Sequence, residues 1–156
     1  MNPCPCGYRG DPKRACRCTP HQVSAYRGRL SGPLLDRIDL IVDVEPVPIG
    51  DLIGEHKGES SAIVRARVLA AREGQLRRPG RAGCLNTALH GRAFERTCEL
   101  NDAGRRLLER SAERLHLSAR GFHRVVKVAR TIADLAGVAS IAPDHLAEAL
   151  QYRIVE

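Results

Sequence analysis

Apolar residues recur at helical spacing along most of the second half of the chain. From Phe122 they fall at i, i+3, i+4, i+7, i+10, i+11 and i+14, which makes one continuous stripe on a helix. Ser118 can cap this helix and Gly137 can end it. The pattern therefore predicts a long amphipathic helix over residues 118–137. The side chains expected on its opposite, polar face are Arg124, Lys127, Thr131 and Asp134.

Shorter patterns of the same period predict further helices, each marked by a capping residue or an initial proline. They are expected over residues 60–77 (capped by Ser60 or Ser61), 90–98, 101–115 (capped by Asn101 or Asp102) and from Pro143 onward. On the first of them the expected apolar face consists of Ile63, Ala66, Leu69, Ala70 and Leu76.

The first 57 residues follow a different pattern. Glycine and proline punctuate residues 1–33, which favours a compact loop over long helices. Leu34–Val47 then contains a run of apolar, β-favouring residues, and Pro46 and Pro48 end it. A strand is predicted there, followed by a connector over residues 48–57. The expected fold class is mainly α with a small β remnant.

Composition excludes several classes of protein. The chain has 156 residues, of which 43% are hydrophobic and 28% charged, values typical of a globular protein. Aromatic residues make up only 3%, so the core must be aliphatic. No apolar stretch approaches the roughly 18 residues of a membrane span, and the first residues lack a signal peptide's apolar segment. We expect a cytoplasmic protein without a membrane partner.

The positive charge is concentrated in two runs. The formal net charge is +7, and residues 1–30 and 60–85 each carry six basic residues against one acidic residue. Such runs favour a polyanionic partner, DNA above all. A solvated, arginine-rich surface without a partner is the alternative. The basic residues are Arg9, Lys13, Arg14, Arg17, Arg27 and Arg29 in the first run, and Arg65, Arg67, Arg72, Arg77, Arg78 and Arg81 in the second.

Two Cys-x-Cys pairs lie close together near the N-terminus, Cys4 with Cys6 and Cys16 with Cys18. Four soft thiolates on one short loop suit tetrahedral Zn²⁺, and the surrounding glycines permit the tight turns that this requires. His21 is a candidate to replace one cysteine. Two disulfides or four free thiols are the alternatives, and a reducing compartment disfavours the disulfides. We expect a structural zinc site.

Two arginines occupy unusual positions. Arg37 lies at the predicted strand entrance between Asp36 and Asp39, where it can form a buried ion pair or project to a phosphate. Arg120 lies in the first turn of the helix that Ser118 caps. That end of a helix favours anions, so an arginine there suits a bound phosphate.

Several long strings of this sequence resemble one family, the magnesium-chelatase-like AAA+ ATPases of the YifB/ComM group, and they match its C-terminal half. The resemblance covers essentially the whole chain. The strings are Met1–Gly7, Cys16–Pro20, Gln22–Tyr26, Arg29–Leu40, Gly58–Ala62, Leu117–Leu135 and His145–Arg153.

The resemblance implies a role for three residues. Asn2 matches the sensor 1 asparagine, which orients water near the γ-phosphate. Arg37 matches the arginine finger, which reaches a nucleotide held by the neighbouring subunit. Arg120 matches the sensor 2 arginine of the lid domain. The family forms homo-hexameric rings that use ATP and Mg²⁺, and its ComM-type members are implicated in transformation as helicases that promote branch migration on DNA.

The resemblance also implies a division of the chain. Residues 1–50 would be the C-terminal remnant of the AAA+ core, with a zinc-binding insertion over 1–33. Residues 51–85 would be a linker with the helix that precedes sensor 2, and residues 86–156 the helical lid domain.

One departure from the family pattern limits the expected activity. A family member carries a G-x-x-x-x-G-K-[ST] loop and an acidic Walker B strand, but here Lys13, Lys57 and Lys127 follow Pro, His and Val. We therefore expect a fragment that hydrolyses no ATP alone and needs the missing ATPase half or full-length subunits as its partner. A stand-alone zinc-containing nucleic-acid module and a motor that inserts Mg²⁺ into a tetrapyrrole are the alternatives.

Overall fold

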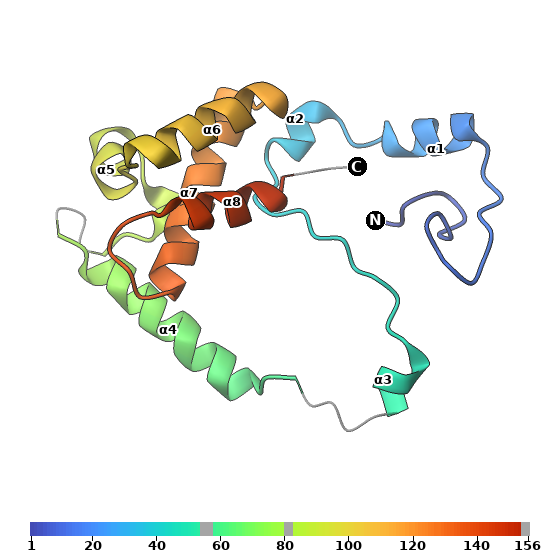
Figure 1. Ribbon diagram of the computed structural model, residues 1–156, viewed down its shortest axis with the longest axis horizontal. Coiled ribbons are helices and arrows are strands. Elements are labelled where there is room, and N and C mark those ends of the chain that lie inside the picture. The colour runs from blue at the N-terminus through green and yellow to red at the C-terminus, as the bar shows by residue number, and fades with distance from the viewer. Residues whose placement is uncertain (54–57, 80–82, 154–156) are drawn as a thin grey trace. The chain divides into compact units, whose positions relative to one another are not determined.

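The computed structural model describes residues 1–53, 58–79 and 83–153, and the mainly helical fold class is confirmed (Figure 1). The chain divides into two compact units. The cysteine unit comprises Met1–Ile38 and the segment from Asp43 to α3, and the helical unit comprises Asp39–Val42 and the helices from α4 onward. The elements are α1 (Pro20–Arg27), α2 (Gly32–Leu35), α3 (Ile49–Ile53), α4 (Ser61–Arg77), the 3₁₀ turn η1 (Asn86–Ala88), α5 (Gly91–Thr97), α6 (Asp102–Arg114), α7 (Ala119–Leu135) and α8 (Pro143–Gln151).

The predicted helices of the helical unit are confirmed, and their caps explain where they begin. Hydroxyl or amide oxygens of Ser60, Asn101 and Ser118 accept hydrogen bonds from backbone N–H groups in the first turns of α4, α6 and α7, at 3.4, 2.8 and 3.1 Å. Gly137 follows α7 with φ of +71°, a conformation that an L side chain rarely adopts. These local signals are independent of packing, which is why sequence located the helices well.

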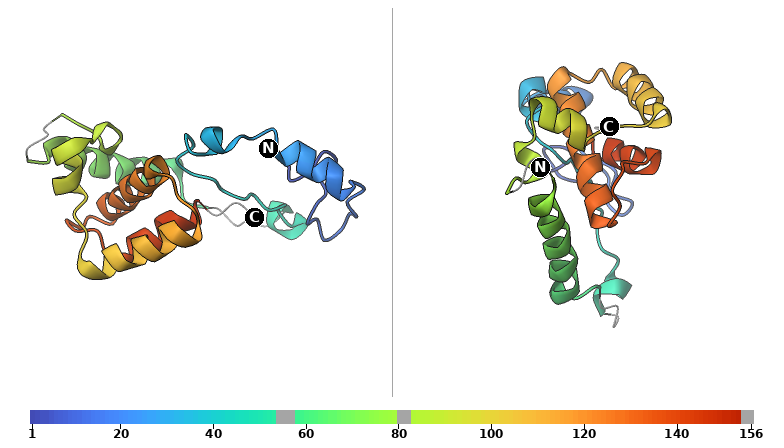
Figure 2. Two further views of the ribbon diagram at one scale, coloured as in Figure 1. Left: turned by 90° about the horizontal axis from the view of Figure 1, so that it is seen from above. Right: turned by 90° about the vertical axis from the view of Figure 1, so that its left-hand side faces the viewer.

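Helix α7 is the centre of the helical unit. It contacts α4 on one side and α8 on the other, and α8 also contacts α6, as the right-hand view of Figure 2 shows. None of the helices in the described ranges is long and apolar enough to cross a membrane. The buried core consists of Leu89, Cys98, Leu108, Val125, Val126, Ala129, Ile141, Leu146, Ala149 and Leu150.

The expected polar face of α7 is wrong at Asp134, because this residue lies in a hydrogen-bonded network against the end of α4 and η1. Asp134 accepts a hydrogen bond from Arg130 Nε at 3.0 Å, pairs with Arg78, and accepts a bond from Asn86 Nδ2 at 2.7 Å. Asn86 Nδ2 also donates to Thr131 Oγ1 at 3.0 Å. The helix therefore buries a second, polar stripe beside its apolar one.

Arg130 is the most buried charged side chain of this network, with 2% of its surface exposed. Its Nη1 and Nη2 donate to the carbonyl oxygens of Ala139 and Val138, both at 2.6 Å. These bonds join the C-terminal half of α7 to the loop that leads to α8. They provide hydrogen-bond acceptors for the buried Arg130 guanidinium, a residue to which the sequence pattern assigned no role.

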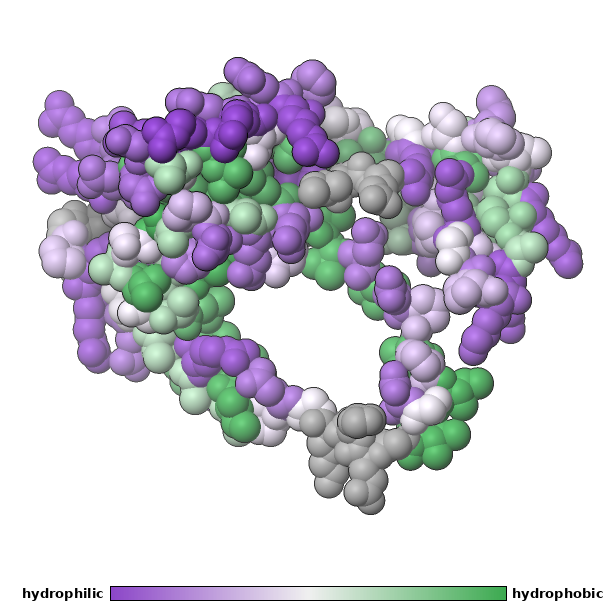
Figure 3. Space-filling model, in the orientation of Figure 1, coloured by the Kyte–Doolittle hydropathy of each residue, from purple (hydrophilic) through white to green (hydrophobic). Residues whose placement is uncertain are grey.

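The expected apolar face of α4 is also wrong. Ile63 and Leu69 are 56% and 46% exposed, and the buried residues are Ala71 and Gln75. Figure 3 shows apolar residues at the surface over α4. The helix meets α7 through small and polar side chains near its C-terminal end, because the polar network rather than an apolar stripe holds the two helices together.

The strand predicted over Leu34–Val47 does not form. Ser31 caps the short helix α2, and the residues after it are irregular and exposed, Val44 to 89%. A strand needs a partner for its backbone groups, and across residues 1–53, 58–79 and 83–153 the β pairing consists of a single bridge, Leu100 with Ile141. The small β remnant is therefore absent from the described residues.

The connector over 48–57 contains a short helix that the sequence pattern did not predict. Residues 49–53 form α3, and the connector's last four residues lie outside the described ranges. Earlier in the chain, the segment Asp39–Val42 packs with the helical unit, where the Ile41 N–H donates to the carbonyl of Tyr152 at 2.9 Å.

Candidate metal centre and arginine positions

The sulfur atoms of Cys4, Cys6, Cys16 and Cys18 all lie within 4.8 Å of one another. Cys4 Sγ is 3.4 Å from Cys6 Sγ and 3.6 Å from Cys16 Sγ, and Cys6 Sγ is 3.7 Å from Cys16 Sγ. Tetrahedral zinc with Zn–S bonds of about 2.3 Å separates its sulfurs by roughly 3.8 Å. The four cysteines can therefore hold one metal ion.

Two glycines and a proline turn bring the sulfurs together. The N–H of Gly7 donates to the carbonyl of Cys4 at 3.0 Å and closes a turn around Pro5, and Gly7 has φ of +83°. Gly10 has φ of +85° and turns the loop back toward the second cysteine pair. The local sequence thus forms the site without a strand or a long helix.

Two short capped segments hold the return path of this loop. Asp11 Oδ1 accepts hydrogen bonds from the N–H groups of Lys13 and Arg14, at 2.7 and 3.0 Å. After Cys18, Thr19 and Gln22 cap the start of α1 reciprocally, with N–H to side-chain oxygen distances of 2.9 and 3.3 Å. Helix α1, which the glycine and proline content obscured, therefore begins directly after the last cysteine.

Backbone hydrogen bonds polarise the cluster. The N–H groups of Tyr8 and Arg17 lower the pKa of the Cys6 thiol to about 6. A backbone bond from Cys6 lowers the pKa of Cys18, but burial and the neighbouring sulfurs raise it to about 12. The backbone N–H groups thus favour the thiolate form of Cys6, whereas burial and the neighbouring sulfurs oppose a further negative charge on Cys18.

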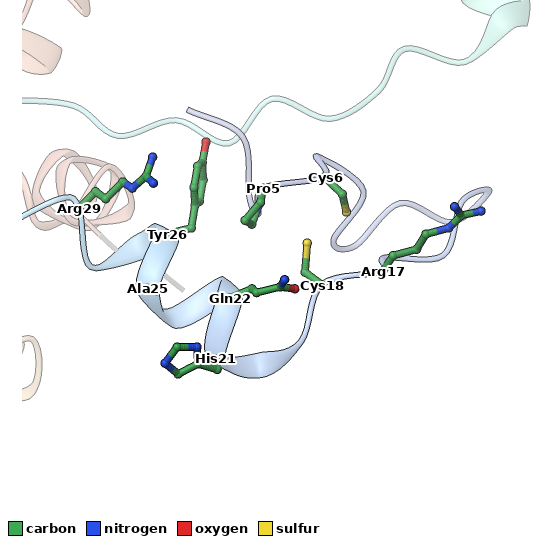
Figure 4. Close-up of a pocket in the computed structure, with 9 residues that line it drawn as sticks. All are labelled: Pro5, Cys6, Arg17, Cys18, His21, Gln22, Ala25, Tyr26 and Arg29. Carbon is green, nitrogen blue, oxygen red and sulfur yellow. The ribbon is translucent and has the colours of Figure 1, made fainter.

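Neither disulfides nor a histidine ligand is present at the cysteine cluster in the described part of the chain. All six are unbridged, and the shortest sulfur separation in the cluster, 3.4 Å, is well beyond the roughly 2.05 Å of a disulfide. His21 lies outside the group of four sulfurs, and Figure 4 shows its ring directed away from Cys18. The four cysteines alone supply a complete tetrahedral ligand set.

Asn2, Arg37 and Arg120 are placed separately. Asn2 and Arg37 belong to the cysteine unit, and Arg120 is exposed in the first turn of α7, in the helical unit. Asn2 lies beside the turn at Gly7, where an added Cβ would be 3.6 Å from Asn2 Nδ2. Arg37 is exposed, and its Nη1 donates to the carbonyl of Pro33 at 2.8 Å.

Tyr26 is the residue near the cysteines that sequence reasoning missed. It lines a cavity of α1 together with Arg29, whose guanidinium carbon is 5.8 Å from the centre of the Tyr26 ring. The available signal was the i, i+3 spacing of tyrosine and arginine on one helix. That spacing is common, so it predicts a helical contact but not a cavity.

Comparison with known proteins places both parts of the chain. Residues 58–153 match the family described as magnesium chelatase, subunit ChlI C-terminal, and residues 1–52 match magnesium chelatase, subunit ChlI. The chain is 47% identical to competence protein ComM of Haemophilus influenzae over 98% of its length, and 45% identical to uncharacterized protein YifB of Salmonella typhimurium over 100%. It is 39% identical to uncharacterized protein Mb2921c of Mycobacterium bovis over 97%.

The chain covers only part of the length of each of these relatives. The chain spans 29% of the length of ComM and 30% of YifB and of Mb2921c. With matches over both parts, the chain belongs to the magnesium-chelatase-like AAA+ ATPase family of the YifB/ComM type and corresponds to less than a third of those relatives.

Proposed function

We propose that the chain supplies the sensor and lid part of an ATP-driven motor that acts on DNA, of the ComM type. The observation that carries this proposal is the 47% identity over 98% of the chain to a protein named for competence, the uptake of DNA. The first 30 residues add six cations against one carboxylate, a charge suited to a polyanion. A helicase that promotes branch migration is the activity proposed for the complete motor.

In this proposal the chain's own residues act on a nucleotide held elsewhere in a hexamer. Asn2 orients the attacking water, Arg37 stabilises charge on the transferring phosphoryl group from the neighbouring subunit, and Arg120 couples nucleotide state to lid position. The exposed guanidinium of Arg37 supports this role, because it is available to a partner subunit. ATP and Mg²⁺ bind only when the phosphate-binding loop is supplied by the rest of the motor.

The cysteine cluster is structural in this proposal. Zn²⁺ would cross-link the Cys4–Cys6 turn to the Cys16–Cys18 turn and would supply folding energy rather than a reactive water, because four cysteines leave no open coordination position. The bound ion would fix the start of α1 relative to Asn2. The proposed division remains 1–50 for the core remnant, 51–85 for the linker and its helix, and 86–156 for the lid.

A chimera tests the proposed function. In ComM of Haemophilus influenzae the segment that matches this chain is replaced by residues 1–156, and ATP hydrolysis is measured with and without DNA. DNA-stimulated hydrolysis comparable to that of the parent supports the proposal. A folded hexameric chimera whose hydrolysis does not respond to DNA contradicts it.

A stand-alone zinc-containing nucleic-acid module is the second candidate. It is favoured by one observation: the four cysteines, their turns and α1 all lie within the cysteine unit. Such a module would bind nucleic acid with its metal in place and would confer no DNA-stimulated hydrolysis on the chimera. The same chimera experiment therefore separates the two candidates.

A further inference from the structure

Helix α1 and the cysteine turns line an open cavity of about 740 Å³ that the preceding assignments leave without a role. Its volume falls within the roughly 300–1,000 Å³ of ligand pockets. Arginine, histidine, glutamine and tyrosine side chains line it, and no carboxylate does. The lining residues are Pro5, Cys6, Arg17, Cys18, His21, Gln22, Ala25, Tyr26 and Arg29.

The cavity combines an aromatic platform with two cations. Figure 4 shows the Tyr26 ring between Arg29 and Pro5, with Arg17 at the opposite end of the lining from Arg29. The guanidinium of Arg29 lies over the Tyr26 ring. A second pair repeats the arrangement nearby, where Arg14 lies 5.2 Å from the Tyr8 ring centre and donates to Tyr8 Oη at 2.8 Å.

The arginines of the cavity differ from those of the helical unit. Every ion pair found among residues 1–53, 58–79 and 83–153 involves an arginine of the helical unit, namely Arg67, Arg77, Arg78, Arg124 or Arg130. Arg17 and Arg29 pair with no carboxylate in those ranges, and Asp11 is occupied by backbone N–H groups of its own turn. Their charge is therefore available to an external anion.

A zinc tetrathiolate would carry two negative charges at one wall of this cavity. Six cations against Asp11 in the first 30 residues exceed that charge, so the surface stays positive with the metal bound. The ligand must then be anionic along its length and carry planar groups that stack on tyrosine. An unpaired nucleic-acid strand meets both requirements, whereas the bases of a duplex are already stacked on each other.

We propose that this cavity binds single-stranded DNA, with one base displacing the Arg29 guanidinium and stacking on the Tyr26 ring, and with backbone phosphates at Arg17 and Arg29. The choice of DNA rests on the proposed function; the stacking and the charge rest on the cavity itself. Stacking supplies affinity without sequence preference, since every base has a π-face. A motor that moves along DNA needs a contact of that kind.

Fluorescence anisotropy with a labelled oligothymidylate of about 12 nucleotides tests the proposal on the 156-residue chain at several salt concentrations. Tyr26→Ala should weaken binding about 10-fold with an unchanged salt slope, and Tyr26→Phe should restore it to within about two-fold. Arg29→Ala should lower the slope of log K against log salt by about 0.7. Arg106→Ala removes an equal charge from an exposed position on α6 and should change neither quantity.

The proposal is overturned if Tyr26→Ala binds as tightly as Arg106→Ala, if a duplex of equal length binds as tightly as the single strand, or if the metal-loaded chain binds no oligonucleotide at low salt. Equal competition by single-stranded RNA overturns the choice of DNA. The chimera tests the proposed function independently of this binding assay. A chimera without DNA-stimulated hydrolysis, together with oligonucleotide binding that depends on Tyr26, would contradict the motor function and support the DNA-binding cavity. A chimera whose hydrolysis is stimulated by DNA, together with unchanged oligonucleotide binding by Tyr26→Ala, would support the motor function and contradict the DNA-binding cavity.

Discussion

The carboxylate of Asp39 pairs with the guanidinium of Arg124, 85 residues later in the chain, and not with Arg37 two residues away. Both partners belong to the helical unit. Arg37 instead donates to the carbonyl of Pro33 and stays exposed. The buried ion pair of Arg37 with Asp36 or Asp39, the structural alternative to an arginine finger, is therefore not formed among the described residues.

Arg37→Ala should consequently leave the stability of the chain nearly unchanged. An exposed side chain with one hydrogen bond to a local carbonyl contributes within about 0.5 kcal/mol to the free energy of unfolding. In the ComM chimera the same substitution should reduce ATP hydrolysis by about 10³-fold or more, the scale of an arginine finger. Thermal melting and turnover are to be measured on the same variant.

Two results contradict the finger assignment for Arg37. One is hydrolysis near that of the unsubstituted chimera, and the other is a large loss of thermal stability. A stable, inactive variant that regains hydrolysis when mixed with subunits lacking only the P-loop lysine would place the arginine at the neighbouring subunit's nucleotide.

Arg130→Ala should destabilise the helical unit by about 3 kcal/mol, because it removes three hydrogen bonds from a buried guanidinium, two to the carbonyl oxygens of Val138 and Ala139 and one to Asp134, which keeps its bonds from Arg78 and Asn86. Arg124→Ala is the matched control, since it also removes an arginine of α7 from an ion pair, but that pair's Asp39 is largely exposed. Its cost should be at most about 1 kcal/mol. Urea unfolding of both variants checks the difference, and equal costs would show that burial does not govern the network.

Sequence predicted the helices of the helical unit but not their environments. Ser60, Asn101 and Ser118 act through bonds to their own first turns, so each helix start could be located without knowledge of its neighbours. Burial depends on what packs against a helix. Asp134 on α7 was expected to face outward and Ile63 on α4 inward, and both expectations failed because polar bonds rather than an apolar stripe join these helices.

The predicted strand failed for a related reason. Its residues have β propensity, but a strand exists only through hydrogen bonds to another strand, which residues Leu34–Val47 do not find in the described part of the chain. The clustering of the four cysteines was predictable because they lie within 15 residues and the intervening glycines supply the turns. The cavity at Tyr26 was not, since it requires α1 and the Cys4–Cys6 turn to meet in space.

Arg120→Ala should have a smaller effect on the chimera than Arg37→Ala. Arg120 is exposed at the start of α7, where Ser118 caps the helix independently, so its removal should not unfold the helical unit. The expected result is a loss of coupling between nucleotide state and lid position, with a decrease in hydrolysis well below that of Arg37→Ala. Comparing DNA stimulation in the two variants checks this order, and a reversed order contradicts the sensor 2 assignment.

Metal removal should unfold the cysteine unit selectively. The purified chain should contain about one zinc ion, and Cys16→Ser should lose it because three sulfurs remain. Cys98→Ser is the matched control: Cys98 lies in the helical core, where burial raises the pKa of its thiol to about 11 and keeps it protonated, so the metal should stay. A chelator should abolish the NMR dispersion of residues 1–30 while the helical unit keeps its thermal transition, since its core contains none of the four ligands. Metal content near zero in a gently purified chain with intact thiols would exclude the zinc site.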